Sequence, residues 1–375
     1  MSANSGVHGH VEAGFGAVAD AFARNFAENG EVGAALCIHR DGAPVVDIWG
    51  GVADSRTGAP WTEHTTATVF SASKGVTAIC VHRLAEQGAI DLDAPVARYW
   101  PEFASGGKEA ITTNMVLAHT AGVPAIDTNF TAEDMRAWTP VIKLVEKQPV
   151  EWRPGTLHGY HALTIGLMLG EIVRRVTGLS LGQYLAREIA GPLGLRFWIG
   201  LPEAELANRA QLIPAPDLPI QLNPLGLRAF GAHRAQWLND PTYLAAEVPS
   251  GNGTGEARAL ARLYAATMGE VDGFRALRPE TTSTLGQVRA SGTDQVLGLP
   301  TSYSAGFMAG AYLGDFYVGR SLSDKAFGHA GSGGSMAFAD PDNGLALGYN
   351  LNGLAHYING DPRIYSIVAA LYGCL

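Results

Sequence analysis

Strand-like segments occupy both ends of this 375-residue chain, and helical segments fill its middle. Near the start, apolar runs at 33–39 and 45–49 flank the turn Arg40-Asp41-Gly42, a pattern typical of an antiparallel hairpin. After residue 300, short apolar or alternating runs recur between glycine-rich turns. This order predicts one α/β domain built from both chain ends, with a mostly helical domain inserted between them.

Hydrophobic periodicity assigns approximate bounds to these segments. Besides the hairpin, strands are expected at 66–70, 302–311, 315–320, 326–329, 335–340 and 344–350. Helices are expected at 14–29, 74–88, 113–118, 132–147, 161–176, 181–190, 255–269 and 362–372. The predicted sheet domain comprises 1–73 and 270–375, and the predicted helical domain comprises 74–269 with a long loop at 191–254.

Composition narrows the class of protein. Hydrophobic residues make up 47% of the chain and charged residues 16%, which is enough apolar content for a large core. The net charge is −9 and only five residues are lysines, so neither nucleic acid nor a membrane surface is an expected partner. Three scattered cysteines, no signal-peptide pattern and no apolar run near ~20 residues predict a soluble, cytoplasmic protein with free thiols.

Two serines lie in motifs that some hydrolases use, but their contexts favour structural roles. Ser180 lies in Gly178-Leu179-Ser180-Leu181-Gly182, where helical patterns on both sides predict a helix N-cap. Ser105 precedes Lys108 by three residues, but the two glycines between them predict a loop that cannot fix their geometry.

A third serine has a more favourable context, in Ser71-Ala72-Ser73-Lys74 at the start of helix 74–88. Residues three apart on a helix share a face, so Ser71 Oγ and Lys74 Nζ can meet. The helix N-terminus favours a developing alkoxide, and a desolvated lysine can act as a base. From this motif alone, a capping serine beside a solvated lysine is an equal alternative.

Two later motifs complete a possible active site. Tyr160 follows a glycine-containing turn and is expected to start helix 161–176, where its phenol could act as general base or acid or simply pack. The run 327–334, which includes Gly331 and Ser332, places glycines on a late strand. A backbone N–H there, paired with that of Ser71, would form an oxyanion hole; the alternative is a plain turn.

Together these motifs resemble those of the serine β-lactamase and penicillin-binding protein superfamily, in particular its class C-like branch, which includes the family VIII carboxylesterases. Ser71-x-x-Lys74 matches the first motif of the family, Tyr160-His161-Ala162 stands in place of Tyr-x-Asn, and His329-Ala330-Gly331 in place of Lys-Thr-Gly. The resemblance implies a β-lactamase-like fold, an antiparallel sheet flanked by the N- and C-terminal helices. It also implies that Ser71 is the nucleophile and that Lys74 and Tyr160 activate it.

The departures from the family pattern indicate the substrate. Ala162 replaces an asparagine that penicillin-recognising members use, and His329 replaces a lysine that holds a substrate carboxylate. We therefore expect a serine carboxylesterase that hydrolyses small neutral esters through an acyl-enzyme on Ser71. The backbone N–H groups of Ser71 and Ser332 are expected to hold the oxyanion, and His329 and Gly331 to line the substrate site.

Several alternatives stay open at this point. The same scaffold could serve a β-lactamase, a D-amino-acid peptidase or amidase, an acyltransferase or a non-catalytic scaffold protein. No metal or organic cofactor is expected, His8 and His10 are expected in a flexible tail, and His119 is interpreted as structural. The aromatic residues Phe230, Trp237 and Tyr243 could line a pocket or pin a loop, and the oligomeric state is not predicted.

Overall fold

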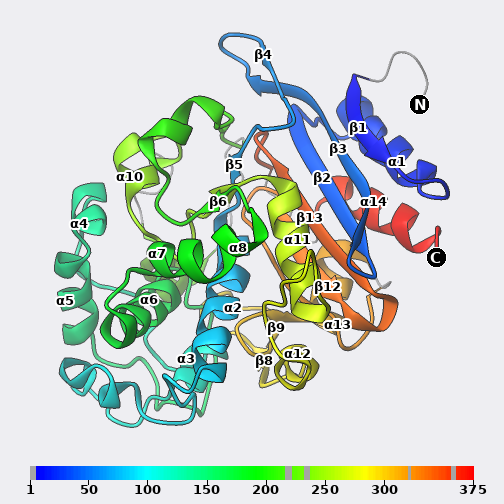
Figure 1. Ribbon diagram of the computed structural model, residues 1–375. Coiled ribbons are helices and arrows are strands. Elements are labelled where there is room, and N and C mark those ends of the chain that lie inside the picture. Colours follow the sequence, from blue (N-terminus) through cyan, green and yellow to red (C-terminus); the bar gives the residue numbers. More distant parts are fainter. Residues whose placement is uncertain (1–5, 216–221, 232–236, 320–321, 356–359) are drawn as a thin grey trace.

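The computed structural model describes residues 6–215, 222–231, 237–319, 322–355 and 360–375. Within them, a large antiparallel sheet separates two layers of helices (Figure 1). Helices α1 (Gly16–Glu28) and α14 (Pro362–Tyr372) pack on one face, and α11 (Ala257–Met268) packs on the other. None of the described helices is both long enough and apolar enough to cross a bilayer.

The sheet joins the two ends of the chain. Its order is β1 (Val7–Val11), β3 (Ala43–Asp54), β2 (Gly33–Arg40), β13 (Leu345–Leu351), β12 (Met336–Asp340), β11 (Phe327–Ala330), β10 (Met308–Ala309), β9 (Pro300–Tyr303) and β8 (Ala290–Thr293), with β4 (Ala59–Pro60) beside β3. The pairing of β2 with β13 places Leu36 opposite Tyr349. The predicted sheet from both chain ends, flanked by the terminal helices, is confirmed.

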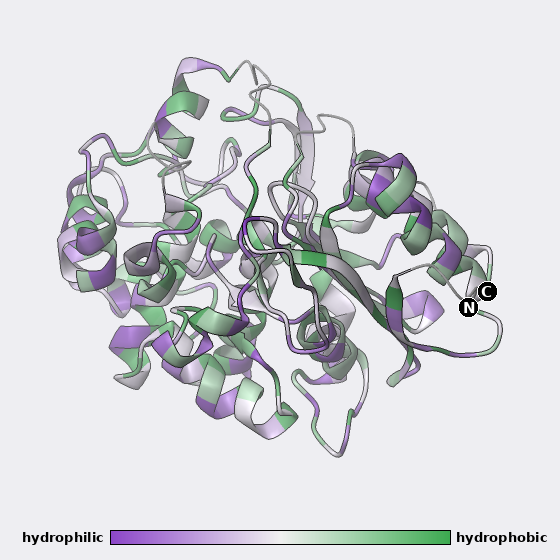
Figure 2. Cartoon of the chain, turned by 90° about the horizontal axis from the view of Figure 1, so that it is seen from above, coloured by the Kyte–Doolittle hydropathy of each residue, from purple (hydrophilic) through white to green (hydrophobic). Residues whose placement is uncertain are grey.

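Successive side chains of a strand point to opposite faces of the sheet, and large and small residues alternate along these strands. Phe338 and Leu347 pack with Phe22 in the core under α1 and α14. On the other face, β13 lies so close to α11 that a Cβ added at Gly348 would be 2.2 Å from the carbonyl oxygen of Ala257. Figure 2 shows hydrophilic residues beside hydrophobic ones along the helices near the two termini, as expected where one helix face packs on a sheet.

The middle of the chain forms the helical layer, whose centre is α2 (Ser73–Glu86), a helix with most of its residues buried. The other helices of this part of the chain are α3 (Thr113–Leu117), α4 (Ala132–Ala137), α5 (Thr139–Lys147), α6 (Thr164–Thr177), α7 (Leu181–Leu185), α8 (Gly191–Leu193), α9 (Pro224–Phe230) and α10 (Pro241–Ala245). Helix α12 (Pro279–Leu285) follows α11, and α13 (Gly310–Leu313) packs against β9, β10 and β11. A small sheet of β5 (Ala67–Thr68), β7 (Thr254–Gly255) and β6 (Phe197–Trp198) lies beside α2. The division at residues 73 and 269 stays a prediction.

Three predicted segments are wrong for identifiable reasons. The expected helix 132–147 breaks at Trp138, which has φ +63°, because Pro140 cannot continue the ladder of the preceding turn. The expected strand 315–320, of which Arg320 lies outside the described residues, is a π-helical turn over Gly314–Val318, although its aromatic residues favour strands. His8 and His10 lie in edge strand β1 rather than in a tail, and Gly9 allows the close approach to β3.

Other bounds differ in extent. The expected strand 66–70 is reduced to β5, and 302–311 divides into the end of β9, β10 and the start of α13. The loop 191–254 contains several of the short elements named above within its described residues. Helix 161–176 begins only at Thr164, so Tyr160 precedes it rather than starting it.

Candidate active site

Ser71 lies in a tight 3₁₀ turn, Phe70–Ala72, which joins β5 to α2. Phe70 has φ +48°, a left-handed conformation that costs energy for a residue with a side chain. Ser73 stabilises the turn: its Oγ donates to the Phe70 carbonyl at 2.5 Å and accepts from the Gly253 amide at 2.9 Å. This turn presents Ser71 at the N-terminus of the buried helix.

Lys74 lies under Ser71 and is only 2% exposed. Its Nζ donates to Ser71 Oγ at 3.1 Å, to the Ala162 carbonyl at 2.9 Å and to the Ser250 carbonyl at 2.8 Å. An ammonium group has three N–H donors, so this set of acceptors matches it. The contact between Ser71 and Lys74 that the motif suggested is therefore present.

Tyr160 approaches Ser71 from the other side. Its Oη donates to Ser71 Oγ at 2.8 Å, and Lys74 Nζ lies 4.8 Å from the centre of its ring. The Ser71 hydroxyl thus has two groups within reach that can exchange a proton with it. Tyr160 lies 89 residues after Ser71 in the sequence, and the structure brings it together with the Ser71–Lys74 motif.

The end of β11 lies against the segment that leads into Ser71. A Cβ added at Gly331 would be 2.2 Å from the Val69 carbonyl oxygen, so a glycine is required for this approach. The Gly331 amide donates to the Ser335 carbonyl, whereas the Ser332 amide donates to none of the described residues. Ser71 and Ser332 both line the same cavity, which is the arrangement an oxyanion hole needs.

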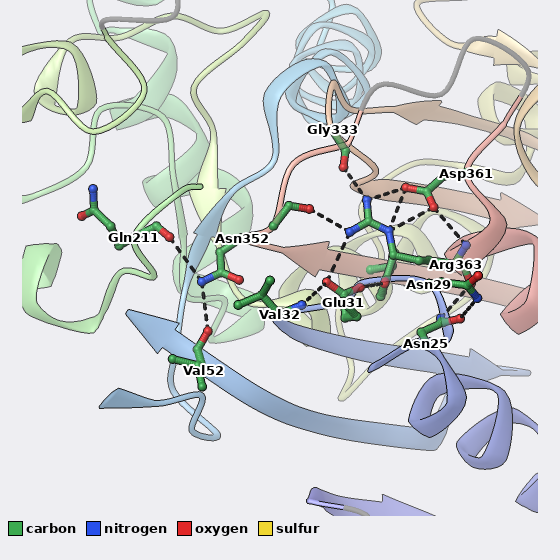
Figure 3. A network of polar contacts seen from close by, with 12 residues as sticks. Asn25, Asn29, Glu31, Val32, Val52, Gln211, Gly333, Asn352, Asp361 and Arg363 are labelled. Carbon is green, nitrogen blue, oxygen red and sulfur yellow. Dashed lines mark hydrogen bonds and ion pairs between the residues drawn. The ribbon is translucent and has the colours of Figure 1, made fainter. Parts of the chain in front are cut away.

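A buried arginine anchors the loop that carries Ser332 (Figure 3). Arg363, at the start of α14, is 1% exposed and donates through Nη2 to the Gly333 carbonyl at 2.8 Å. The same guanidinium pairs with Asp361 and, through Nη1, with Glu31 at 3.3 Å. Because its charge is balanced by these carboxylates, Arg363 is not free to bind an anionic substrate.

His329 is 1% exposed and lies behind the cavity wall, which includes Gly331 but not His329. Burial, with the nearby charge of Lys74, lowers the pKa of His329 to about 3, so the ring is neutral. Its Nδ1 lies 2.7 Å from the Ala330 carbonyl and therefore carries the ring proton. A contact between His329 and substrate stays a prediction.

The cavity beside Ser71 measures about 250 Å³, and much of its wall is apolar. Its apolar lining includes Phe230, Leu297, Leu299, Met308, Phe316 and Ile364. Among the described lining residues none is a lysine or arginine, and the charged one is Asp361. The cavity therefore suits an apolar, uncharged group next to the reacting carbon.

The remaining sequence candidates lie elsewhere or are structural. Phe230 lines the cavity, whereas Trp237 and Tyr243 contact each other at a tilt, with ring centres 5.3 Å apart, and are not among the residues that line it. Ser180 caps α7 by accepting from the Gln183 amide, as predicted. Ser105 is an exposed turn residue, but Lys108 is fully buried and donates to two backbone carbonyls.

Three groups at the site have no recognisable signal in the sequence. The carbonyls of Ala162 and Ser250 hold Lys74, but any residue supplies a carbonyl. Asp294 is 0% exposed, accepts a hydrogen bond from the Tyr160 amide at 3.0 Å and belongs to no motif.

Buried neutral histidines around the site predict loss of stability in acid. Burial lowers the pKa of His161 to about 4 and that of His329 to about 3, and it holds the pKa of His119 well below its usual range. Below about pH 6.5 the unfolded chain binds protons that the folded chain does not. This stability is therefore present above that pH and decreases as the pH falls toward the folded pKa values, by up to about 1.4 kcal/mol per pH unit for each histidine.

Urea unfolding at about pH 8 and about pH 5 measures this loss. The midpoint is expected to fall by more than the scatter of replicates at the lower pH. Burial raises the pKa of Glu31 to about 7, which adds stability as the pH falls and partly offsets this loss. An equal or higher midpoint at about pH 5 in Glu31→Gln, which lacks this offset, would contradict neutral burial of these rings.

Comparison with known proteins agrees with the geometry. The Beta-lactamase family model matches residues 18–369. The esterase/beta-lactamase LipL of Mycobacterium tuberculosis is 35% identical over 365 residues, which cover 91% of this chain and 82% of LipL. A family VIII carboxylesterase of known structure superposes with a TM-score of 0.90 at 36% identity, covering 98% of this chain and 100% of that one.

A penicillin-binding protein homologue from Caulobacter crescentus is equally similar in fold, with a TM-score of 0.90 at 35% identity and coverage of 98% and 100%. Sequence and fold thus agree over nearly the whole chain. This protein belongs to the beta-lactamase family and is a serine hydrolase with the fold of that family.

Proposed function

We propose that this protein is a serine carboxylesterase that hydrolyses small neutral esters through an acyl-enzyme on Ser71. The observation that carries the proposal is the position of Ser71 Oγ, within hydrogen-bond distance of Lys74 and Tyr160 and at the wall of a largely apolar cavity. The two esterase relatives reported above support the reaction class.

The acylation step uses the Lys74–Tyr160 pair. Tyr160 reacts in its phenolate form: the Ser71 proton passes to the phenolate oxygen, which gives the phenol, while Ser71 Oγ forms a bond to the ester carbonyl carbon. Lys74 favours this transfer because its ammonium charge lies beside both residues, where it stabilises the phenolate before the transfer and the forming alkoxide during it. Tyr160 then returns the proton to the leaving alcohol oxygen as the carbon–oxygen bond of the ester breaks.

The oxyanion forms during both acylation and deacylation. We assign its two donors to the amides of Ser71 and Ser332; one such donor is worth about 10²–10³ in rate. In deacylation, water gives a proton to the same pair and attacks the acyl carbon, releasing the acid and restoring the Ser71 hydroxyl. The Arg363 contact to Gly333 keeps the loop that carries Ser332 in place.

A direct test is hydrolysis of the p-nitrophenyl esters of acetate, butyrate and octanoate, with intact mass measured during turnover. An adduct of acyl mass is expected, and peptide mapping should place it on Ser71. Nitrocefin and a D-amino-acid amide belong in the same panel, because LipL is described as both an esterase and a beta-lactamase. Turnover of nitrocefin or of the amide without ester hydrolysis would contradict the proposed reaction and assign a different one. Reactions with added acceptor alcohols would reveal acyl transfer through the ester products that they form.

The cavity predicts strong discrimination against a negatively charged acyl group. We expect kcat/KM for the p-nitrophenyl monoester of glutaric acid to be about 10²-fold or more below that for p-nitrophenyl valerate. The two acyl chains have the same length, but the glutarate carboxylate would be desolvated without a cation among the described wall residues, because Arg363 lies outside that wall and is already paired with Asp361. Steady-state kinetics at constant ionic strength measures the ratio, and equal values would contradict the neutral-ester assignment.

A further inference from the structure

Tyr160 reaches Ser71 from a segment that is neither helix nor strand. Because α6 begins only at Thr164, no helical hydrogen bonds hold residues 158–161. The 2.8 Å contact between Tyr160 Oη and Ser71 Oγ therefore depends on groups from other parts of the chain.

His119 holds this segment on one side. Its carbonyl accepts from the Gly159 amide at 3.1 Å, and its Nδ1 accepts from the His161 amide at 2.9 Å. The His119 ring centre lies 5.1 Å from that of Tyr160. His119 itself has φ +59°, so its unusual backbone turns both acceptors toward the tyrosine segment.

Asp294 holds the segment on the other side and contacts Tyr160 directly. Its Oδ1 accepts from the amides of Tyr160, Val296 and Leu297 at 2.8–3.0 Å. Its Oδ2 accepts from the hydroxyls of Thr301 and Tyr303, each at 3.2 Å. A fully buried side chain thus accepts five hydrogen bonds, and one of them comes from the backbone of the tyrosine that contacts the nucleophile.

We propose that Asp294 is a positioning residue for the reaction: it fixes the Tyr160 backbone so that Oη stays within hydrogen-bond distance of Ser71. This inference rests on the proposed function, in which Tyr160 moves the Ser71 proton. A displacement of 1 Å between reacting groups can lower a rate about 10²-fold. A side chain that is hydrogen-bonded directly to the Tyr160 amide therefore has a large influence on the rate.

The same oxygen also couples the proton-transfer group to the substrate cavity. Leu297, whose amide shares Oδ1 with that of Tyr160, lines the cavity. Asp294 therefore sets the position of Tyr160 relative to the wall against which the substrate packs. Thr301 and Tyr303 support Oδ2 but line no part of the cavity among its described residues.

The test compares two substitutions at one position. Asp294→Ala removes all five contacts and is expected to lower kcat about 10²-fold while KM stays within about threefold, because substrate still meets the apolar wall. Asp294→Asn is expected to retain most of kcat. Its amide oxygen can accept from the three backbone N–H groups, and its NH₂ group can donate to the two hydroxyls, which also accept.

Tyr303→Phe is the matched control, because it removes one donor to Oδ2 and leaves the Tyr160 amide contact in place. Its kcat should stay near wild type, although its melting temperature falls. If Asp294→Ala does not fold, Asp294→Ser takes its place under the same criteria, since its hydroxyl keeps a polar group in the buried space while lying short of the amides.

A second readout separates this inference from the choice of substrate. The rate at which a fluorophosphonate probe labels Ser71 reports the reactivity of the serine whether or not the protein hydrolyses esters. Slow labelling of Asp294→Ala, with wild-type-like labelling of Asp294→Asn and Tyr303→Phe, supports the positioning role even if ester hydrolysis is absent. Wild-type kcat or labelling in the alanine variant, or equal loss in the asparagine variant, would overturn it.

Discussion

Replacing Ser71 with alanine is expected to abolish ester hydrolysis while leaving the protein folded. Loss of a nucleophile in enzymes of this kind lowers kcat by about 10⁴-fold or more. The cost in stability should stay below about 1 kcal/mol, because Ser71 is half-buried at the cavity and water can replace its hydroxyl as a partner of Lys74 and Tyr160. Steady-state kinetics of the variant measures the loss of hydrolysis, intact mass measures the loss of the acyl adduct, and urea unfolding measures the change in stability.

Ser180→Ala is the matched control for this experiment, because Ser180 lies in the competing nucleophile motif. It should keep wild-type kcat and lose about 1 kcal/mol of stability, since the substitution removes the N-cap of α7. Hydrolysis that survives Ser71→Ala and disappears in Ser180→Ala would show that Ser180, and not Ser71, is the nucleophile.

Replacing Lys74 with methionine is expected to lower kcat about 10³-fold or more. General acid–base groups typically contribute about 10²–10⁴-fold to a rate. Methionine fills most of the space of the lysine but supplies no charge beside Ser71 and Tyr160. Proton transfer from Ser71 then lacks its electrostatic support, and acylation becomes slow. Rapid-mixing measurements of the p-nitrophenol burst report this step directly.

Lys108 supplies an unusually close control for Lys74. It too is a buried lysine in an S-x-x-K sequence, and its Nζ donates to the carbonyls of Glu146 and Gln148. Lys108→Met therefore removes the same kind of buried contacts far from the nucleophile and should reduce stability but not kcat. Near wild-type hydrolysis by Lys74→Met, or equal losses of kcat in both variants, would contradict the proposed mechanism.

The parts of the site that could be predicted are those with local geometry. Ser71 and Lys74 are three residues apart at a helix start, so their contact could be expected from local geometry, although a solvated lysine was an equal alternative from the motif alone. Gly331 was recognisable because a glycine cluster on a strand indicates close approach of backbones. Tyr160 was predicted as a site residue from the family resemblance as much as from the turn that precedes it.

The parts that could not be predicted depend on contacts between distant segments. Lys74 meets the carbonyls of Ala162 and Ser250 across 88 and 176 residues, and Asp294 meets the Tyr160 amide across 134. Such partners leave no periodic signal, because their identity is set by the fold and often by the backbone alone. The break at Trp138 is a different case, because its cause is local: Pro140 stands in the sequence, but the hydrophobic pattern continues through it and predicts an unbroken helix.

The pairing of β2 with β13 and the contact of Arg363 with Glu31 across 332 residues have a consequence for biosynthesis. A nascent chain that has left the ribosome as far as α11 already contains Ser71, Lys74 and Tyr160. It still lacks β11, the Ser332 loop and the arginine that anchors this loop. Until β13 emerges, the hairpin of β2 and β3 has an unpaired edge on β2, which can pair with other chains and aggregate. Activity should therefore appear only after α14 has left the ribosome, and truncation before α14 should leave an aggregation-prone chain rather than a slower enzyme.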